Sequence, residues 1–348
     1  MSVVTDLTRF RHQPVRVLLV KLSSMGDIIH VTGAVRAIRQ ALPQAHITMV
    51  VEARWAALMR HNPHLNTLIE STPRDRVTPV YLAEMYRKLR PYQPFDIALD
   101  LQGNRRSAAW VYLSRAQSQL GRGSFRPGWE QVMVPDLRQH AVSVCAEICR
   151  SVGIDVANPD PELFTCDQDE QRLQQVLVQE KRLSGPYIVL NPFSRWFSKS
   201  WPIQSVAQII PHLRKTVPYP LVLNGWEDDR ERAQELLSLL SPNSVTSLVG
   251  QLTLDEALCL FKNAKLMVTC DSGPMHAAAA FGVPVVALFG PTHPERTGPW
   301  GPGHRVIQAI RPTTHNTYRS DPQGLHMQAL EPETILDAIG SLTGEPPA

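Results

Sequence analysis

The chain has 348 residues, and this length predicts two domains, because a domain typically holds roughly 100–200 residues. Hydrophobic residues make up 43% and charged residues 19% of the sequence, which excludes a disordered or fibrous protein. The 35 basic and 32 acidic residues leave a formal charge of +3, too small to indicate a nucleic-acid partner. No apolar run reaches the roughly 18–20 residues of a membrane span, and the charged N-terminus lacks a signal-peptide core, so we expect a cytoplasmic protein.

The five cysteines are odd in number and scattered along the chain, unlike a secreted disulfide framework, and they indicate a reducing compartment. Cys145 and Cys149 are spaced to share one face of a helix, but no histidine or second cysteine pair completes a tetrahedral set. We therefore expect both to be small buried side chains, and the sequence predicts no metal site.

Strands and helices alternate along the first half of the chain. Residues 15–20 form a short apolar run typical of a buried parallel strand, and a turn at Ser23, Ser24 and Gly26 leads into one helical pattern that continues to Pro43. Further elements are expected as strands at 47–51 and 97–101 and helices at 55–59, 82–89 and up to Val152. This alternation predicts a doubly wound parallel sheet.

The same rhythm restarts after the proline-rich segment 158–161, which we interpret as the linker. We expect an α/β protein with two Rossmann-like domains, at 1–160 and 161–330, facing across a cleft, and a C-terminal helix and tail at 331–348. The expected strands are 187–190, 221–223, 266–269 and 283–289, and the expected helices begin near Gln168 and at 203–213, 228–240, 254–263, 274–281 and 332–342.

The turn after the first strand, Lys21 to Asp27, is the first candidate site, because doubly wound sheets bind ligands beyond the carboxyl ends of their strands. Asp27 either caps the following helix or acts as a general base, and the sequence alone leaves the two interpretations about equal. The turn offers a single glycine, Gly26, so it lacks the G-x-G-x-x-G pattern of a dinucleotide site.

A second turn, Asp271 to His276, again joins a strand to a helix. Ser272 and Gly273 are expected to leave backbone N–H groups free at the helix start, where a diphosphate could bind. The alternative is a well-capped helix that packs closely through its alanines, and spacing alone slightly favours a core position for His276.

Two further segments follow strands. In 191–202, Lys199 could place a positive charge on a phosphate group, although a single lysine is more often a solvated surface residue. In 224–229, acidic residues begin a helix, which is ordinary capping chemistry as well as a candidate ribose contact.

Together these segments resemble the ADP-heptose:lipopolysaccharide heptosyltransferases, glycosyltransferase family 9, which have the two-domain GT-B fold. The resemblance covers nearly the whole chain and rests mainly on 17–30, 271–276, 289–292 and 298–301, with further matches at 100–103, 140–142 and 199–202. The sequence departs from the family's usual pattern in three places: Ser272 replaces the usual threonine, Pro274 and Met275 stand where leucine or another residue is common, and segment 315–327 lacks the cysteine pair of many relatives.

The resemblance also implies roles for individual residues. Asp27 matches the catalytic base and Lys199 the lysine near the sugar diphosphate. The donor-binding residues that it implies are Ser194 in the diphosphate loop, Asp229 at the ribose with Asp228 as the adjacent alternative, Leu252 at adenine through its backbone, and Asp271, Ser272, Gly273 and His276 in the donor turn.

The implied activity is inverting transfer of a heptose or related sugar from an ADP-sugar to a lipopolysaccharide inner-core or similar glycan. No cofactor is required by the sequence, and magnesium is an aid at most. The implied acceptor is an anionic glycolipid at the inner face of the cytoplasmic membrane, and the candidate residues to grip it are Arg105, Arg106, Arg122 and Arg126. The alternatives are a GT-B-like nucleotide-sugar epimerase and a non-catalytic sugar-nucleotide binding protein.

Overall fold

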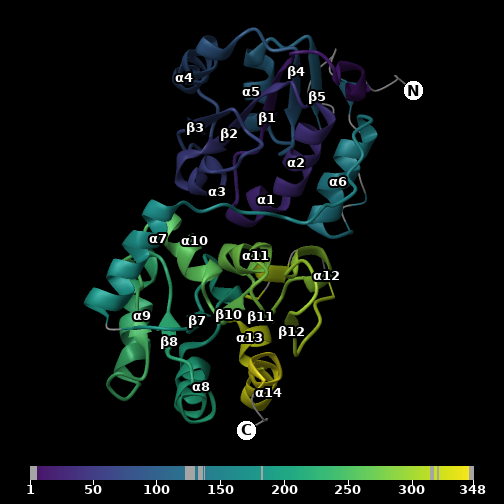
Figure 1. Ribbon diagram of the computed structural model, residues 1–348. Coiled ribbons are helices and arrows are strands. Elements are labelled where there is room, and N and C mark those ends of the chain that lie inside the picture. Colours follow the sequence, from purple (N-terminus) through teal and green to yellow (C-terminus); the bar gives the residue numbers. More distant parts are fainter. Residues whose placement is uncertain are drawn as a thin grey trace. The chain divides into compact units, whose positions relative to one another are not determined.

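The computed structural model (Figure 1) describes residues 6–121, 130, 131, 136, 138–181, 183–313, 317–319 and 321–344. They form two compact units, Met1–Phe164 and Thr165–Ala348. Each unit contains one six-stranded sheet whose strand pairs are all parallel. This confirms the predicted α/β class with two doubly wound sheets. Among the described helices, none has both the length and the hydropathy needed to cross a bilayer.

The sheet of the first unit has the strand order β3-β2-β1-β4-β5-β6. Its strands are β1 (Arg16–Val20), β2 (His46–Glu52), β3 (Thr67–Ser71), β4 (Ile97–Asp100), β5 (Ser118–Gly121) and β6 (Glu130–Gln131). The helices are α1 (Met25–His30), α2 (Thr32–Ala41), α3 (Ala57–Arg60), α4 (Pro79–Leu89), α5 (Arg105–Ser114) and α6 (Ala141–Ser151), with 3-10 turns at Leu7–Phe10, Ala53–Trp55 and Arg90–Tyr92.

Helices cover both faces of this sheet, which explains the continuous apolar sequence of β1. Helices α4 and α5 pack side by side on one face (Figure 1), where Tyr81, Met85 and Trp110 join the buried core. Helix α6 packs against α1 and α2. Residues 17–20 of β1 are therefore buried whichever way their side chains point.

The second unit has the strand order β12-β11-β10-β7-β8-β9. Its strands are β7 (Ile188–Asn191), β8 (Leu221–Leu223), β9 (Thr246–Ser247), β10 (Leu266–Cys270), β11 (Val285–Leu288) and β12 (Arg305–Ile307). Its helices are α7 (Asp167–Gln174), α8 (Ile203–Thr216), α9 (Arg230–Ser238), α10 (Leu254–Lys262), α11 (Gly273–Ala280), α12 (Pro294–Thr297), α13 (Leu325–Gln328) and α14 (Pro332–Thr343), with a π-helical turn at Gln175–Glu180 and 3-10 turns at Phe197–Lys199, Glu227–Asp229 and Thr317–Arg319.

The C-terminal helix is an integral part of the second unit. Ile335 and Ile339 of α14 are buried in the same core cluster as the central strands β7 and β10. Helix α14 also contacts α8, β11 and β12. The helix expected at 332–342 is thus confirmed, and it covers one face of the second sheet.

The sequence predicts one helical pattern from the first turn to Pro43, but the structure has two helices there. The chain ends α1 at His30, and α2 begins at Thr32, with Val31 between them at φ −89° and ψ −6°. The side chains of both helices continue the same apolar periodicity, so the break leaves no signal in the sequence pattern.

The proline-rich segment 158–161 is anchored to the first unit. The Arg36 guanidinium donates hydrogen bonds to the backbone oxygens of Asn158 and Asp160 at 2.9 and 3.0 Å, and it pairs with Glu162 at 2.5 Å. The Thr32 hydroxyl accepts a bond from the backbone N–H of Glu162 at 2.8 Å. Because these contacts hold the segment against α2, the two units divide after it, between Phe164 and Thr165.

Gly33 allows this segment to approach α2. A Cβ atom at residue 33 would lie 2.3 Å from the backbone oxygen of Pro159. We expect Gly33→Ala to destabilise the first unit by about 1–3 kcal/mol, because the clash is with backbone rather than with a flexible side chain. Urea unfolding measures this effect. Gln40→Ala, at an exposed position of the same helix, is the control that should retain wild-type stability, and equal stability of the two variants contradicts the prediction.

Candidate active site

The first candidate site lies where the strand order of the first sheet reverses. Strand β1 pairs with β2 on one side and β4 on the other, so the chain leaves β1 and β4 in opposite directions and opens a crevice at their carboxyl ends. The turn that carries Lys21 and Asp27 follows β1, and residues 101–104 follow β4.

The side chain of Gln102 holds the turn after β1 in place. Its Oε1 atom accepts hydrogen bonds from the backbone N–H groups of Leu22 and Ser23 at 3.1 and 3.2 Å. Asp100 orders residues 102 and 103 in turn, since its Oδ1 accepts their backbone N–H groups at 2.9 Å. Burial raises the pKa of Asp100, although these bonds, the Ser107 hydroxyl and the charge of Lys21 oppose the rise.

Asp27 lies in the first turn of α1. Its Oδ2 atom accepts hydrogen bonds from the backbone N–H and the hydroxyl of Ser24 at 3.0 and 2.7 Å, so the capping interaction is present. Its Oδ1 atom lies 3.6 Å from the buried ammonium of Lys21, and 48% of its side chain is exposed. Desolvation alone would raise the pKa of Asp27, but Lys21 and the two Ser24 bonds outweigh it and lower this pKa. The carboxylate is therefore ionised at neutral pH and accessible from solvent.

The second candidate site lies at the corresponding reversal in the second sheet, where β7 pairs with β8 on one side and β10 on the other. Asn191, buried at the end of β7, connects the three strand ends. Its amide nitrogen lies 3.4 Å from the hydroxyl oxygens of Thr269 and Ser272, and its carbonyl oxygen accepts a 2.8 Å bond from the Asn224 side chain.

Lys199 and Asp271 form an ion pair at this edge of the sheet. The Lys199 ammonium lies 2.7 Å from Asp271 Oδ2, and both side chains are largely buried. The hydroxyl of Thr292 donates a second bond of 2.7 Å to the same oxygen. Lys199 is thus a held, nearly desolvated cation rather than a solvated surface lysine, and Asp271 fixes its position.

The start of α11 provides backbone donors beside this pair. Ser272 is the N-cap residue in extended conformation, and no described atom accepts the backbone N–H of Ser272 or Gly273. Pro274 stands in the first turn, where its missing N–H costs nothing. His276 is buried, as its spacing slightly favoured. An eight-residue helix with unused N-terminal donors can bind an anion.

The remaining predicted donor residues lie in loops of the same unit. Asp229 turns inward, where it accepts the backbone N–H of Trp226 at 3.0 Å and lies 3.6 Å from Arg232, whereas Asp228 is exposed. Burial raises the pKa of Asp229. Ser194 closes the loop before Lys199, since its backbone N–H donates to the Ser200 hydroxyl at 3.0 Å.

Leu252 follows the turn at Gly250, which has a positive φ of 65°. No hydrogen bond to the backbone of Leu252 occurs among the described residues. Its N–H and C=O groups are therefore available to recognise a base edge. The contact between the Leu252 backbone and adenine stays a prediction.

Sequence reasoning missed the residues that position these sites. Gln102, Asn191, Asn224 and Thr292 stand in segments that the sequence singled out, but single polar residues at strand ends carry no separate signal. Of the expected acceptor arginines, Arg106 pairs with the buried Glu52 at 2.6 Å and donates to the backbone of Arg74, while Arg105 is exposed. Arg122 and Arg126 lie outside the described residues.

Four of the five cysteines are buried. Cys145 and Cys149 are buried, as expected, and desolvation raises the pKa of the Cys149 thiol to about 12. Cys259 and Cys270 are buried too, and their pKa values also rise to about 12. The thiols of Cys149, Cys259 and Cys270 are therefore protonated at neutral pH, and the four buried cysteines pack as small apolar side chains.

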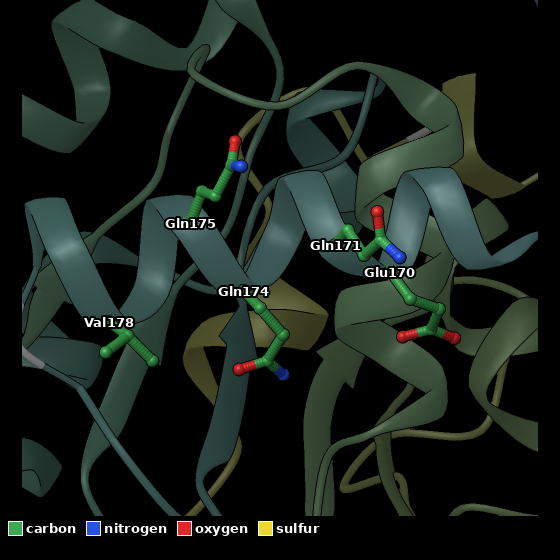
Figure 2. Close-up of a pocket in the computed structure, with 5 residues that line it drawn as sticks. All are labelled: Glu170, Gln171, Gln174, Gln175 and Val178. Atoms are coloured by element: carbon green, nitrogen blue, oxygen red, sulfur yellow. The ribbon is translucent and has the colours of Figure 1, made fainter.

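A surface hollow of about 560 Å³ lies along α7 and the π-helical turn after it (Figure 2). It is lined by Glu170, Gln171, Gln174, Gln175 and Val178. Glu170 already pairs with Lys262 at 2.8 Å. This hollow offers amide groups but no nucleophile, base or cluster of charges, and we do not regard it as the active site.

Two parallel α/β units, each with polar groups gathered at its switch point, are the architecture of the GT-B type glycosyltransferases. The profile of glycosyltransferase family 9 (heptosyltransferase) matches residues 82–326, and the chain belongs to this family. It is a glycosyltransferase, as its resemblance predicted.

Individual relatives agree with this assignment. The chain is 27% identical to lipopolysaccharide heptosyltransferase 2 of Salmonella typhimurium, over 95% of this chain and 99% of that protein. The crystal structure of a family 9 glycosyl transferase from Veillonella parvula shares its fold, with a TM-score of 0.87 and 24% identity over 94% of this chain and 97% of that one. E. coli heptosyltransferase WaaC, solved with ADP-2-deoxy-2-fluoro heptose, has a TM-score of 0.71 and 22% identity over 94% and 99%.

The helix start at Gly273 generates a direct test of the donor site. We expect Gly273→Val to lower ADP affinity at least about tenfold, because a branched side chain would fill the space where a phosphate approaches the backbone donors. Gly273 is not among the residues with positive φ, so its backbone conformation does not require glycine. Calorimetric titration with ADP, alongside thermal unfolding, checks this. A folded variant with wild-type affinity would move the anion site elsewhere.

Proposed function

We propose that this enzyme transfers a heptose, with inversion, from ADP-heptose to the inner core of a lipopolysaccharide precursor. The observation that carries the proposal is the buried Lys199–Asp271 pair beside the free N–H groups that begin α11. This arrangement suits the diphosphate of a nucleotide sugar. Family membership supports the reaction class, and the names of the relatives support heptose as the sugar and lipopolysaccharide as the acceptor.

The second unit supplies stabilisation of the leaving group. As the bond between the anomeric carbon and the diphosphate oxygen breaks, negative charge grows on ADP. Lys199 and the backbone donors of Ser272 and Gly273 can neutralise that charge, and being held beforehand they need no reorganisation during the reaction. Asp229 and the backbone of Leu252 are assigned to the ribose and the adenine.

The first unit supplies the base. Asp27 accepts the proton of an acceptor hydroxyl while that oxygen forms its bond to the anomeric carbon, on the side opposite to the departing ADP. The proton ends on the carboxylate and the sugar configuration is inverted. The ionised state and the exposure of Asp27 support this role.

The proposed reaction uses no cofactor, and magnesium assists at most. Asp271, the carboxylate in the donor turn, already holds an ammonium at 2.7 Å and a hydroxyl at 2.7 Å. A lysine that is always present can serve the role that a divalent cation serves in metal-dependent transferases.

Asp27→Asn should lower the transfer rate by at least the roughly 10²-fold typical of a lost general base, because the amide cannot accept the proton. ADP-heptose affinity should persist. Rates of transfer to a purified core acceptor, with the donor titrated separately, make the measurement. Ser24→Ala is the comparison variant: it removes the hydroxyl that donates to Asp27 Oδ2 but leaves the carboxylate, so it separates loss of the base from loss of one of its hydrogen bonds. Asp27→Asn with a wild-type rate refutes the assignment.

Lys199→Ala should weaken donor binding and slow transfer, each by about tenfold or more, because a charge-assisted contact to phosphate contributes about 1.5–3 kcal/mol. The substitution also leaves Asp271 buried without its cation. We would therefore measure the double variant Lys199→Ala/Asp271→Asn in parallel, and Lys215→Ala as a surface control. If donor affinity and turnover both match those of the control, Lys199 has no role in the reaction.

A further inference from the structure

Apolar side chains gather on one outer surface of the first unit. Val77 precedes α4, Val80 and Tyr86 lie on α4, and Tyr112 lies on α5; all four are exposed, Val80 to 71%. The Arg115 guanidinium at the end of α5 lies 5.9 Å from the Tyr86 ring, which joins the two helices into one surface. We call the exposed side chains of residues 73–92 and 105–115 the α4–α5 face (Figure 1).

The core does not require these apolar residues. Helix α4 buries Tyr81, Met85 and Leu89 against the sheet, and this stripe is enough to seat the helix. Val80 lies on the opposite, solvent-facing side of α4, where helices of globular proteins normally carry polar residues. Tyr86 lies at the flank of α4 toward Arg115 of α5. The exposed apolar side chains of these two helices and the loop before them are therefore available to a partner outside this unit.

The same face concentrates positive charge. Segments 73–92 and 105–115 contain eight arginines and lysines but two acids, a surplus of +6 in a chain of net charge +3, so the rest of the chain is net negative. One of the two acids, Glu84, forms an ion pair with Lys88 at 3.2 Å. No described carboxylate pairs with the side chains of Arg76, Arg87, Arg90 and Arg105.

We propose that the α4–α5 face docks on the surface of an anionic phospholipid bilayer. Arginines around exposed valine and tyrosine side chains match such a surface, since guanidinium groups pair with headgroup phosphates while the apolar side chains enter the boundary of the acyl region. Tyr86 and Tyr112 suit either a membrane interface or base stacking, but the exposed Val77 and Val80 have no ring with which to stack on a base, and they favour a bilayer over a nucleic acid. The inference deepens the proposed function, because a membrane glycolipid acceptor would then be met at a bound surface.

The test uses the full chain and two kinds of vesicle, phosphatidylcholine alone and phosphatidylcholine mixed with phosphatidylglycerol. The wild-type protein should sediment with the anionic vesicles far more than with the neutral ones. Arg87→Glu/Arg90→Glu should lower that partition at least about 25-fold, from about fivefold for each basic residue near the surface. Val80→Glu should also weaken binding, and an acid in the first turn of α4 suits the helix dipole.

Arg214→Glu/Lys215→Glu is the matched control, because these two exposed basic residues occupy the last turn of α8 and the same charge is reversed there. It should retain wild-type binding, and thermal unfolding checks that each variant is folded. Equal binding to both kinds of vesicle, equal losses in the two double variants, or tighter binding to duplex RNA than to anionic vesicles would overturn the proposal.

A transfer assay separates this inference from the proposed function. With a water-soluble, deacylated core acceptor, both double variants should keep the wild-type rate, while with the acceptor in anionic vesicles Arg87→Glu/Arg90→Glu alone should be slower. Failure of the wild type to transfer to either acceptor contradicts the proposed function, whereas the vesicle partition still decides the docking surface.

Discussion

The reversal of strand order in each sheet is the constraint from which both candidate sites follow. A polypeptide that leaves β1 and β4, or β7 and β10, toward opposite faces of the sheet cannot fill the space between the two departing loops with its own backbone. Polar groups at these strand ends must find partners from neighbouring strands. Gln102 and Asn191 do so, because each connects the ends of strands that are adjacent in space but distant in sequence. The loops that carry Asp27 and Lys199 therefore owe their order to the sheets.

Buried acids contribute to this order in a common way. Asp100, Glu52 and Asp271 each lie at or just beyond a strand end, and each is matched by backbone donors or by a cation held close to it. Removing one partner would leave a buried charge unpaired, which costs far more than the pair contributes. The acids thus fix the positions of the groups beside them. The Asp271 carboxylate fixes the Lys199 ammonium, which we propose to stabilise the leaving group.

Much of this fold can be predicted from the sequence because buried parallel strands leave continuous apolar runs. The predicted bounds of β1, β8 and β10 agree nearly to the residue with those in the structure. The edge strands β3, β6, β9 and β12 and the inner strand β5 escape prediction because they are two to four residues long or carry polar residues. Turns at strand ends predict where the candidate sites lie, but they do not predict the contacts within those sites. The ion pair of Lys199 with Asp271 and the hydrogen bond from Ser23 to Gln102 each join residues far apart in the sequence. No rule of residue spacing predicts such contacts.

The low pKa of Asp27 bears on how a base at this position could work. A carboxylate held ionised by Lys21 and Ser24 is a weak base, so it cannot remove a proton from a neutral sugar hydroxyl in advance of attack. Transfer of the proton becomes favourable only as the attacking oxygen gains positive character from its bond to the anomeric carbon. In the proposed reaction, breakdown of the donor would then be well advanced when the proton moves, and most of the demand would fall on stabilising ADP. Lys199 and the start of α11, rather than a strong base, would carry most of the barrier lowering in such a reaction.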